Sequence, residues 1–327
     1  MRKVLVTGGA GFIGSHIVEA MYRKGAEVVV IDNLSTGKIE NILPFLSDID
    51  FIKGDVNDIE VLKELMKGVD VVFHQAALGS VPRSIEEPMN IHINNSSGTL
   101  SVLIAAQKAG VKRVVYAASS SAYGDTPTLP KRENMNRLPK SPYAVSKVAG
   151  ELYCNVFSQV YGLETVVLRY FNVFGPRQDP QSEYAAVIPK FIKLMIAGKS
   201  PTIYGDGKTS RDFTPVQNVV YANLLASEAE NVSGKIFNVA LGCKVTLNEL
   251  VMHLNILLHT SLNPEYVAER IGDVKHSFAD VSSAREKLGY SPIMTFDEGL
   301  EETVLATLNT TSLYANKNIQ EQIKYAI

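Results

Sequence analysis

Short apolar runs rich in β-branched residues alternate with longer runs of helical periodicity through the first half of the chain. The run 3–7 precedes a helical pattern over 12–24 and a second apolar run over 27–31. The alternation continues and predicts strands at 50–53, 69–74, 111–117 and 164–169 and helices at 58–67, 94–109 and 142–161. This order predicts an α/β fold with a doubly wound, mostly parallel sheet that binds ligands beyond the carboxyl ends of its strands.

Glycines follow the first predicted strand at the spacing Gly8-x-x-Gly11-x-x-Gly14, and Asp32 ends the second strand. The spacing lets the backbone approach a pyrophosphate and directs a helix N-terminus toward its charge. A carboxylate 18 residues after Gly14 can accept a hydrogen bond from an adenosine ribose and would repel a 2′-phosphate. The order therefore predicts a Rossmann domain that prefers NAD to NADP. The ends of the next two strands should line the same cofactor, with Asp55 near the adenine: Asp55, Val56, Gln75, Ala76 and Ala77.

The chain changes character after residue 170, where loops rich in Pro, Gly and Asn replace the regular alternation. A capping-box pattern, Thr246 with Glu249, precedes the apolar run 247–258 and predicts a helix there. We expect residues 1–170, rejoined by part of 215–242, to form the NAD-binding domain. Residues 171–327 should form mainly a smaller mixed α/β lobe whose loops face the cofactor cleft.

Ser141 and Pro142 are favoured residues at the start of a helix, and they open the predicted helix 142–161. Within it Tyr143 and Lys147 are four residues apart and share one face. A free tyrosine keeps its proton to a pKa of about 10, and an ammonium about 4 Å away would favour the phenolate by up to roughly 4 kcal/mol. Tyr143 is therefore a candidate general base, although a Tyr and a Lys at this spacing usually belong to an ordinary helix surface.

Three serines, Ser119, Ser120 and Ser121, follow the predicted strand 111–117. Alone they would be an ordinary polar loop. Next to the Tyr143 helix, a serine hydroxyl could share the proton of the substrate group that Tyr143 attacks, while Lys147 also holds the nicotinamide ribose.

Together these residues resemble the extended short-chain dehydrogenases/reductases, and within them the UDP-hexose 4-epimerases. The motifs stand in the order of that family over nearly the whole chain: Thr7-Gly-Gly-Ala-Gly-Phe-Ile-Gly14, Asp32-Asn33, Asn95 before Gly98-Thr99, Ser119 to Gly124, Tyr143 to Lys147, Arg169-Tyr-Phe-Asn172, Arg211-Asp212 and Arg270-Ile-Gly-Asp273.

The resemblance implies roles residue by residue. It makes Ser119, Tyr143 and Lys147 catalytic. The cofactor-binding residues it adds to those already named are Phe12, Ile13, Asn33, Asn95 and Phe171, together with Tyr143 and Lys147 themselves. It implies that Asn172 and Arg211 contact the substrate diphosphate, Arg270 a phosphate, Asp273 the uridine ribose and Tyr204 the uracil face. Further substrate contacts are expected from Ser80, Ser119, Ser120, Ser121, Tyr143 and Val187.

Neighbouring activities of the family differ in local chemistry. Sugar 4,6-dehydratases carry an Asp-Glu pair just before the position of Tyr123, because elimination of water needs a further acid and base. Ser120 and Ser121 stand there in this chain. Decarboxylases acting on UDP-glucuronate usually have a Glu in the same segment, which is missing here. A dehydratase, a decarboxylase and a non-catalytic NAD-binding protein nevertheless remain alternatives to an epimerase.

Ser277 bears on substrate size. In the epimerases that this chain resembles, the residue at the position of Ser277 resembles a gate that limits the size of the group on carbon 2 of the sugar. A large aromatic side chain at this position leaves room only for a hydroxyl. A small residue admits an N-acetyl group. The segments 79–84, 172–180 and 185–189 also resemble the subgroup that acts on UDP-N-acetylhexosamines. The expected substrate pair is therefore UDP-GlcNAc and UDP-GalNAc, and UDP-glucose and UDP-galactose remain open as further substrates. The alternative is that Ser277 is an ordinary small packing residue.

The composition of the chain limits the other classes of partner that it can bind. The chain has 34 acidic and 32 basic residues and no Lys/Arg-rich stripe, which gives no electrostatic support to a nucleic-acid or membrane partner. Cys154 and Cys243 form no CxxC pair, and the six histidines show no metal-ligand spacing, so we expect no disulfide scaffold and no metal. The absence of a signal-peptide pattern favours a cytoplasmic location. The family suggests a homodimer joined through the helices at 94–109 and 142–161.

Overall fold

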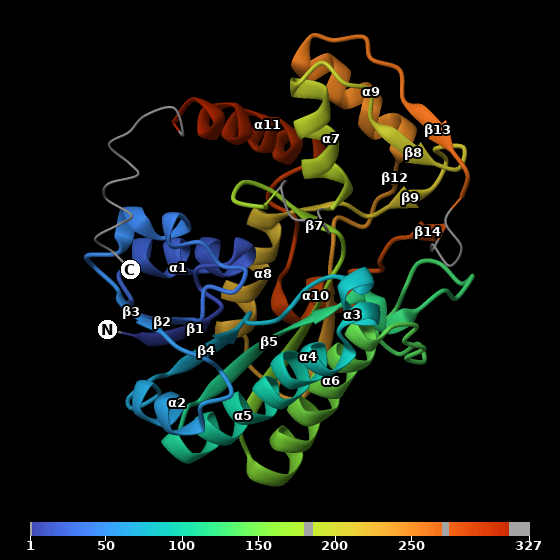
Figure 1. The fold of residues 1–327 in the computed structure, drawn as a ribbon. Helices are drawn as coiled ribbons and strands as arrows, with labels where there is room; N and C mark the ends of the chain where they lie inside the picture. Colours follow the sequence, from blue (N-terminus) through green and yellow to red (C-terminus); the bar gives the residue numbers. More distant parts are fainter. Residues whose placement is uncertain (1, 180–185, 270–274, 314–327) are drawn as a thin grey trace.

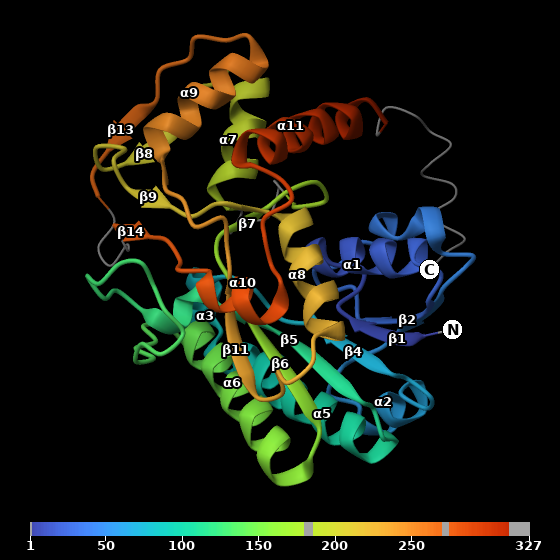
Figure 2. The same ribbon diagram turned by 180° about the vertical axis from the view of Figure 1, so that it is seen from behind.

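A seven-stranded parallel sheet forms the centre of the computed structural model, which describes residues 2–179, 186–269 and 275–313. The strand order is β11-β6-β5-β4-β1-β2-β3, and each adjacent pair is parallel (Figures 1 and 2). The strands are β1 (Lys3–Thr7), β2 (Glu27–Asp32), β3 (Asp50–Lys53), β4 (Val71–His74), β5 (Arg113–Ser119), β6 (Glu164–Tyr170) and β11 (Lys235–Val239). The expected doubly wound α/β sheet is confirmed.

Helices cover both faces of this sheet (Figures 1 and 2). On one face lie α1 (Phe12–Arg23) and α8 (Val216–Glu228), and on the other α2 (Ile59–Leu65), α5 (Gly98–Ala109) and α6 (Pro142–Tyr161). In β1, Val4 and Val6 are buried in the first of the two cores, and Leu5 between them is buried in the second. Because both faces are covered, the middle positions of most strands are apolar on both sides of the sheet.

The helix predicted at 94–109 has a different start. Two short helices, α3 (Val81–Glu86) and α4 (Pro88–Ile91), come first, and a π-helical segment η3 (His92–Ser97) leads into α5. Asn95 lies in this π-helical segment, and its side chain bonds both backbone groups of Leu78. Segments of this kind often occur at functional sites.

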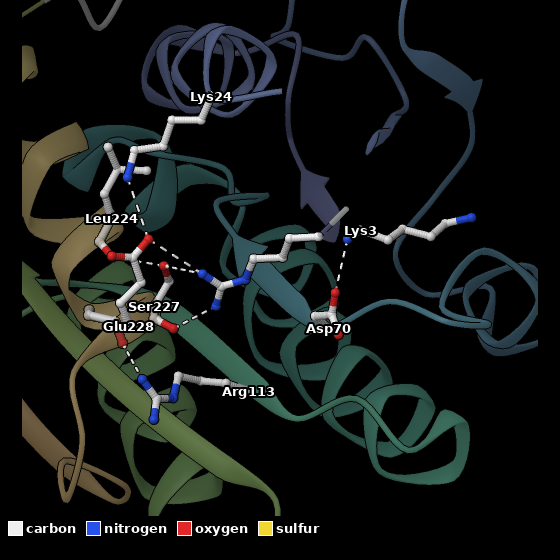
Figure 3. Close-up of polar contacts among 9 residues, drawn as sticks. Lys3, Lys24, Asp70, Arg113, Leu224, Ser227 and Glu228 are labelled. Atoms are coloured by element: carbon white, nitrogen blue, oxygen red, sulfur yellow. Dashed lines mark hydrogen bonds and ion pairs between the residues drawn. The ribbon is translucent and has the colours of Figure 1, made fainter. Parts of the chain in front are cut away.

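The segment that carries α8 and β11 is attached to the sheet by polar contacts as well as by its apolar face. Arg113 of β5 donates to the carbonyl of Ala226 at 2.9 Å, and Lys24 after α1 pairs with Glu228 at 3.4 Å (Figure 3). In the same view Ser227 donates to the carbonyl of Leu224. These contacts hold the end of α8 beside the strands, and the chain then enters β11 at the sheet edge next to β6.

The remaining elements form a second lobe around a separate core (Figure 1). Its helices are α7 (Val187–Ile196), α9 (Leu247–Leu258) and α11 (Phe296–Leu313), while α10 (Ser282–Leu288) packs against β11. Its short strands are β7 (Val173–Phe174), β8 (Thr202–Tyr204), β9 (Ser210–Arg211), β10 (Thr214–Pro215), β12 (Val245–Thr246), β13 (Glu265–Val267) and β14 (His276–Ser277). The predicted capping box of Thr246 and Glu249 is present at the start of α9. Among the described helices, none has the length and apolar character needed to cross a membrane.

Candidate active site

A cavity of about 920 Å³ opens at the carboxyl ends of the central strands. Its volume lies within the range of small-ligand sites, about 300–1,000 Å³. The turn between β1 and α1, the ends of β2, β4 and β5 and the first turns of α6 line it, and the second lobe adds residues 177–179 and Ala186. The predicted cofactor and catalytic residues that line it are Gly8, Gly11, Phe12, Ile13, Gly14, Asp32, Asn33, Val56, Gln75, Ala76, Ala77, Tyr143 and Lys147.

The glycine turn leaves one side of the cavity bare of side chains. Gly8 has φ +67°, and a Cβ there would lie 2.7 Å from the amide nitrogen of Ala76. A Cβ at Gly11 would meet only the carbonyl oxygen of Gly8 and would otherwise extend into open space. Gly11 is also the N-cap of α1 and provides no side-chain cap, so the first amides of the helix remain available to a ligand. This cradle fits the diphosphate of a dinucleotide.

Asp32 borders the cavity at the end of β2 with only 7% of its surface exposed. Its carboxylate accepts hydrogen bonds from the amides of Ala10 at 3.0 Å and Leu34 at 2.8 Å. Burial raises the pKa of Asp32, and these backbone hydrogen bonds oppose the rise. A carboxylate oriented in this way can accept from ribose hydroxyls and disfavours a phosphate at the same place.

Asp55 lies one step behind the cavity surface. Its neighbours Gly54 and Val56 line the cavity, whereas its carboxylate accepts from Asn33 at 3.1 Å and from Asn57 at 2.8 Å. Asn33 lines the cavity itself. The contribution of Asp55 in this geometry is to orient Asn33.

Tyr143 and Lys147 project into the cavity from the start of α6. The sequence fixes this start as expected, with Ser141 accepting from the amide of Ala144 at 3.1 Å and Pro142 in the first turn. Lys147 is 4% exposed; its Nζ donates to the carbonyl of Ala117 at 2.9 Å and lies 5.3 Å from the centre of the Tyr116 ring. Two elements, β5 and α6, therefore share the catalytic end of the cavity.

The expected electrostatic effect of Lys147 on Tyr143 differs from what this geometry gives. Burial raises the pKa of Tyr143, and only a hydrogen-bonding interaction with the Ser119 side chain lowers it. Burial also lowers the pKa of Lys147 to about 8. The predicted lowering of the tyrosine pKa is wrong for the protein alone, because desolvation of the buried phenol is the largest influence on it and outweighs the interaction with Ser119.

Ser119 ends β5, and its side chain faces Tyr143. Its hydroxyl accepts from the amide of Ser121 at 3.2 Å, which fixes the hydroxyl at the end of the strand. Ser120 and Ser121 begin the 3₁₀ turn η4 (Ser120–Tyr123) directly after it. The structure thus places Ser119 beside Tyr143. Tyr143 and Lys147 line the cavity, whereas the three serines do not.

Two predicted cofactor residues, Asn95 and Phe171, do not line the cavity. Asn95 is 1% exposed, and besides Leu78 its amide contacts the hydroxyl of Ser146 at 3.0 Å. Phe171 is fully buried, with its ring 6.1 Å from that of Tyr123. Their sequence neighbours Asn94 and Tyr170 line the cavity instead.

The predicted substrate residues lie partly together and partly apart. Ser277 is the register partner of Arg211 in the pairing of β14 with β9. Asn172 adopts φ +33° and donates to the backbone oxygen of Asp212 at 3.2 Å, so these three residues gather around 210–212.

The other predicted substrate residues are spread around this group. Ser80 is the N-cap of α3, Val187 is the first residue of α7 beside the cavity-lining Ala186, and Tyr204 ends β8. Arg270 and Asp273 lie outside the described residues.

Sequence reasoning missed several basic side chains of the cavity. Lys38, Arg83 and Arg177 line it, and they belong to loops or a short helix without a recognisable motif for this role. Lys38 pairs with Asp179 at 3.1 Å across the cavity mouth, and Arg177 pairs with Glu19 of α1. Such cations suit a diphosphate. Within the described part of the chain, no group of three His, Cys, Asp or Glu residues is arranged to hold a metal ion.

Comparison with known proteins shows the family of the chain. The model of the NAD dependent epimerase/dehydratase family matches residues 4–240. The UDP-glucose 4-epimerase of Mycolicibacterium smegmatis is 38% identical over 306 residues, which cover 92% of this chain and 97% of that protein.

Two solved structures resemble the chain over most of their length. One is a UDP-N-acetylglucosamine 4-epimerase from Methanobrevibacter ruminantium in complex with UDP-N-acetylmuramic acid, with 45% identity, a TM-score of 0.91 and coverage of 94% of this chain and 99% of that one. The other is the Thermus thermophilus UDP-glucose 4-epimerase in complex with NAD, with 38% identity, a TM-score of 0.84 and coverage of 93% and 98%. The family model matches well over half of the chain, and the chain therefore belongs to the NAD-dependent epimerase/dehydratase family.

Proposed function

We propose that the protein inverts carbon 4 of a UDP-hexose with NAD as a bound cofactor, and that UDP-GlcNAc and UDP-GalNAc are its favoured pair. The observation that carries the proposal is that Tyr143 and Lys147 line the same cavity as the glycine cradle, and that the side chain of Ser119 interacts with Tyr143. The resemblance to epimerases of UDP-N-acetylglucosamine and of UDP-glucose supports it. Because those two differ in substrate, Ser277 is what favours the N-acetylated pair.

Tyr143 accepts the proton of the sugar 4-hydroxyl, through or beside Ser119. When bound, NAD would accept a hydride from carbon 4 and would donate it back to the same carbon, so the net reaction would involve no redox change. Lys147 contributes a cation beside the phenol and a donor for the nicotinamide ribose. Since burial raises the pKa of Tyr143 in the protein alone, the positive charge of a bound nicotinamide ring would have to supply the stabilisation of the phenolate that Lys147 alone does not.

The intermediate 4-keto sugar must present both faces to the same cofactor. We infer that Asn172, Arg211 and Arg270 hold the diphosphate while Tyr204 and Asp273 hold the uridine. The hexose can then turn about its diphosphate link, after which Tyr143 returns the proton. This assigns NAD to the domain 1–170 with part of 215–242, and the UDP-sugar mainly to residues 171–327.

We also propose a cytoplasmic homodimer. Apolar side chains stand exposed along α6, including Leu152 at 50% and Val156 at 45%, and on the neighbouring α3 and α4, including Ile85 at 65%. A second copy would cover this face. Sedimentation of Leu152→Glu should give a monomer while the wild-type chain sediments as a dimer; Leu305→Glu, at an equally exposed position of α11, is the control.

The test of function is incubation of the purified protein with each of the four UDP-sugars, followed by anomeric NMR and mass measurement. Epimerisation interconverts UDP-GlcNAc and UDP-GalNAc at unchanged mass. Loss of 18 Da or of 44 Da (the masses of water and of carbon dioxide, roughly) from a UDP-sugar would instead indicate the dehydratase or decarboxylase of the same family, and NAD binding without turnover would indicate a non-catalytic protein.

A further inference from the structure

Residues 276–280 contain Ser277 and are called the gate segment below. The second lobe holds this segment from one side, because the amide of Asp212 donates to the carbonyl of Ser277 at 2.8 Å and the Asp212 carboxylate accepts from Ala279 at 3.2 Å. On its other side, Lys131 donates to the carbonyl of Phe278 and accepts from the amide of Asp280, both at 2.9 Å. The gate segment is therefore fixed at both edges.

Asn238 of β11 is the residue that joins this second edge to the catalytic end of the sheet. It is fully buried, and its Nδ2 donates to the carbonyls of Lys131 at 3.0 Å and Asp280 at 3.1 Å. Its Oδ1 accepts from the hydroxyl of Tyr123 at 2.6 Å. Both amide hydrogens and the amide oxygen are thus used, each by a different segment of the chain.

Tyr123 ends the serine loop, defined as residues 119–123. Its side chain is 1% exposed, and the guanidinium of Arg169 lies 4.6 Å from the centre of its ring. Arg169 in turn pairs with Glu151 of α6 at 2.7 Å. Burial raises the pKa of Tyr123 to about 12, so its hydroxyl stays protonated and donates to Asn238 over the physiological range.

A continuous hydrogen-bonded path therefore runs from the serine loop through Tyr123 and Asn238 to Asp280 in the gate segment. The two ends of this path carry Ser119 and Ser277 respectively. In the proposed reaction Ser119 faces carbon 4 of the sugar and Ser277 faces carbon 2. A rigid link between the two loops fixes the width available to the substituent on carbon 2.

We propose that Tyr123 and Asn238 are positioning residues that set the spacing between the serine loop and the gate segment, and through it the preference between N-acetylated and plain UDP-hexoses. This inference rests on the proposed function. An acetamido group would lie against the gate segment while the serines hold carbon 4, so its binding depends on both loops at once. A hydroxyl on carbon 2 leaves that space open and depends on the serine loop alone.

Two variants cut the path at different points. Tyr123→Phe removes only the hydroxyl that Asn238 accepts. Asn238→Asp keeps an acceptor for Tyr123 but replaces the amide hydrogens that bind Lys131 and Asp280. Tyr290→Phe is the matched control, since Tyr290 is also fully buried and donates its hydroxyl at 2.9 Å to the backbone of Ala240, outside both loops. The measurements are kcat/KM for UDP-GlcNAc and for UDP-glucose, bound NAD and Tm. If UDP-glucose is not turned over, its inhibition constant replaces its kcat/KM.

For Tyr123→Phe we expect kcat/KM for UDP-GlcNAc to fall about fivefold more than kcat/KM for UDP-glucose. A difference of this size corresponds to the net free energy that one buried hydrogen bond contributes. Asn238→Asp should shift the ratio in the same direction, and the double variant should shift it no further than the larger single change, because both cut one path. Tyr290→Phe should leave the ratio unchanged.

Equal losses on both substrates, additive shifts, or loss of NAD or of Tm beyond that of Tyr290→Phe would overturn the inference and assign the two residues a structural role. A wild-type protein inactive on UDP-GlcNAc would instead contradict the proposed function.

Discussion

Ser277 lies opposite Arg211 in the parallel pairing of β14 with β9, although 66 residues separate the two strands along the chain. The pairing joins the predicted gate over carbon 2 to the predicted diphosphate arginine in one small sheet. If Arg211 holds the diphosphate as proposed, a change of side chain at Ser277 acts beside the residue that binds the substrate link.

Ser277→Tyr should suppress turnover of the N-acetylated pair about tenfold or more relative to UDP-glucose, because a large ring fills the space of the acetamido group. Kinetics on both pairs check this. Ser277→Ala, which keeps the position small, is expected to leave the ratio unchanged. Equal effects of Ser277→Tyr on both pairs would remove Ser277 from the specificity argument.

Tyr143→Phe should lower kcat by about 10²–10⁴-fold, the usual worth of a general acid–base residue, while bound NAD is retained. Lys147→Ala should also lower kcat and should weaken NAD retention, since Lys147 serves both. Tyr153→Phe changes a partly exposed tyrosine of the same helix and is the control. Near-normal turnover in either Tyr143→Phe or Lys147→Ala would refute the assigned role.

Asp32→Asn should reduce the preference for NAD over NADP. The asparagine side chain has the size of the aspartate and keeps one oxygen that can accept from the backbone N–H groups of Ala10 and Leu34. It lacks the negative charge that repels a 2′-phosphate. Titration calorimetry with both dinucleotides measures the ratio of their Kd values. An unchanged ratio would mean that the surrounding loop, rather than Asp32, selects the cofactor.

The sequence predicts six of the seven strands of the central sheet, because each of these six is a local apolar run and the helices between them carry their own start or stop residues. It does not predict β11 or α8 as elements, and it places their residues only within a segment that rejoins the domain. It does not predict the π-helical segment at Asn95, because the hydrogen bonds of this residue go to Leu78, 17 positions away. The two-residue strands β9 and β14 carry no periodic signal, so the pairing of Ser277 with Arg211 depends on the tertiary fold alone.

The candidate site likewise contains residues that the sequence predicts and residues that it does not predict. Its glycines, Asp32, Tyr143 and Lys147 stand in motifs with fixed spacing and are recognisable in the sequence. Lys38 and Arg177 reach the cavity from loops, and the contact of Tyr123 with Asn238 joins residues 115 positions apart. The direction of the Tyr143 pKa shift depends on burial, which residue spacing alone does not give.

The buried pair of Glu151 and Arg169 makes a prediction for stability. Both side chains are fully buried, and Arg137 also pairs with Glu151 at 2.8 Å. Glu151→Gln should lower the free energy of unfolding by about 3–5 kcal/mol, because it leaves an unpaired buried cation. Urea denaturation measures this, and Glu151→Leu combined with Arg169→Met should recover much of the loss. Glu60→Gln, which breaks the exposed pair with Lys63, is the control and should change little.

His74 predicts how stability depends on pH. It is 1% exposed and contacts the hydroxyls of Thr7 at 2.7 Å and Thr99 at 3.0 Å, and burial together with the nearby Lys147 cation lowers its pKa to about 3. Since an unfolded histidine titrates near pH 6.5, the unfolded chain binds the proton that the native chain excludes. Stability from this group is therefore complete above about pH 6.5 and declines as the pH falls, by about 2 kcal/mol at pH 5. His74→Asn should unfold with a correspondingly shallower pH slope between pH 8 and pH 5 in urea titrations. Parallel slopes for the two proteins would show that His74 accepts a proton in the folded state.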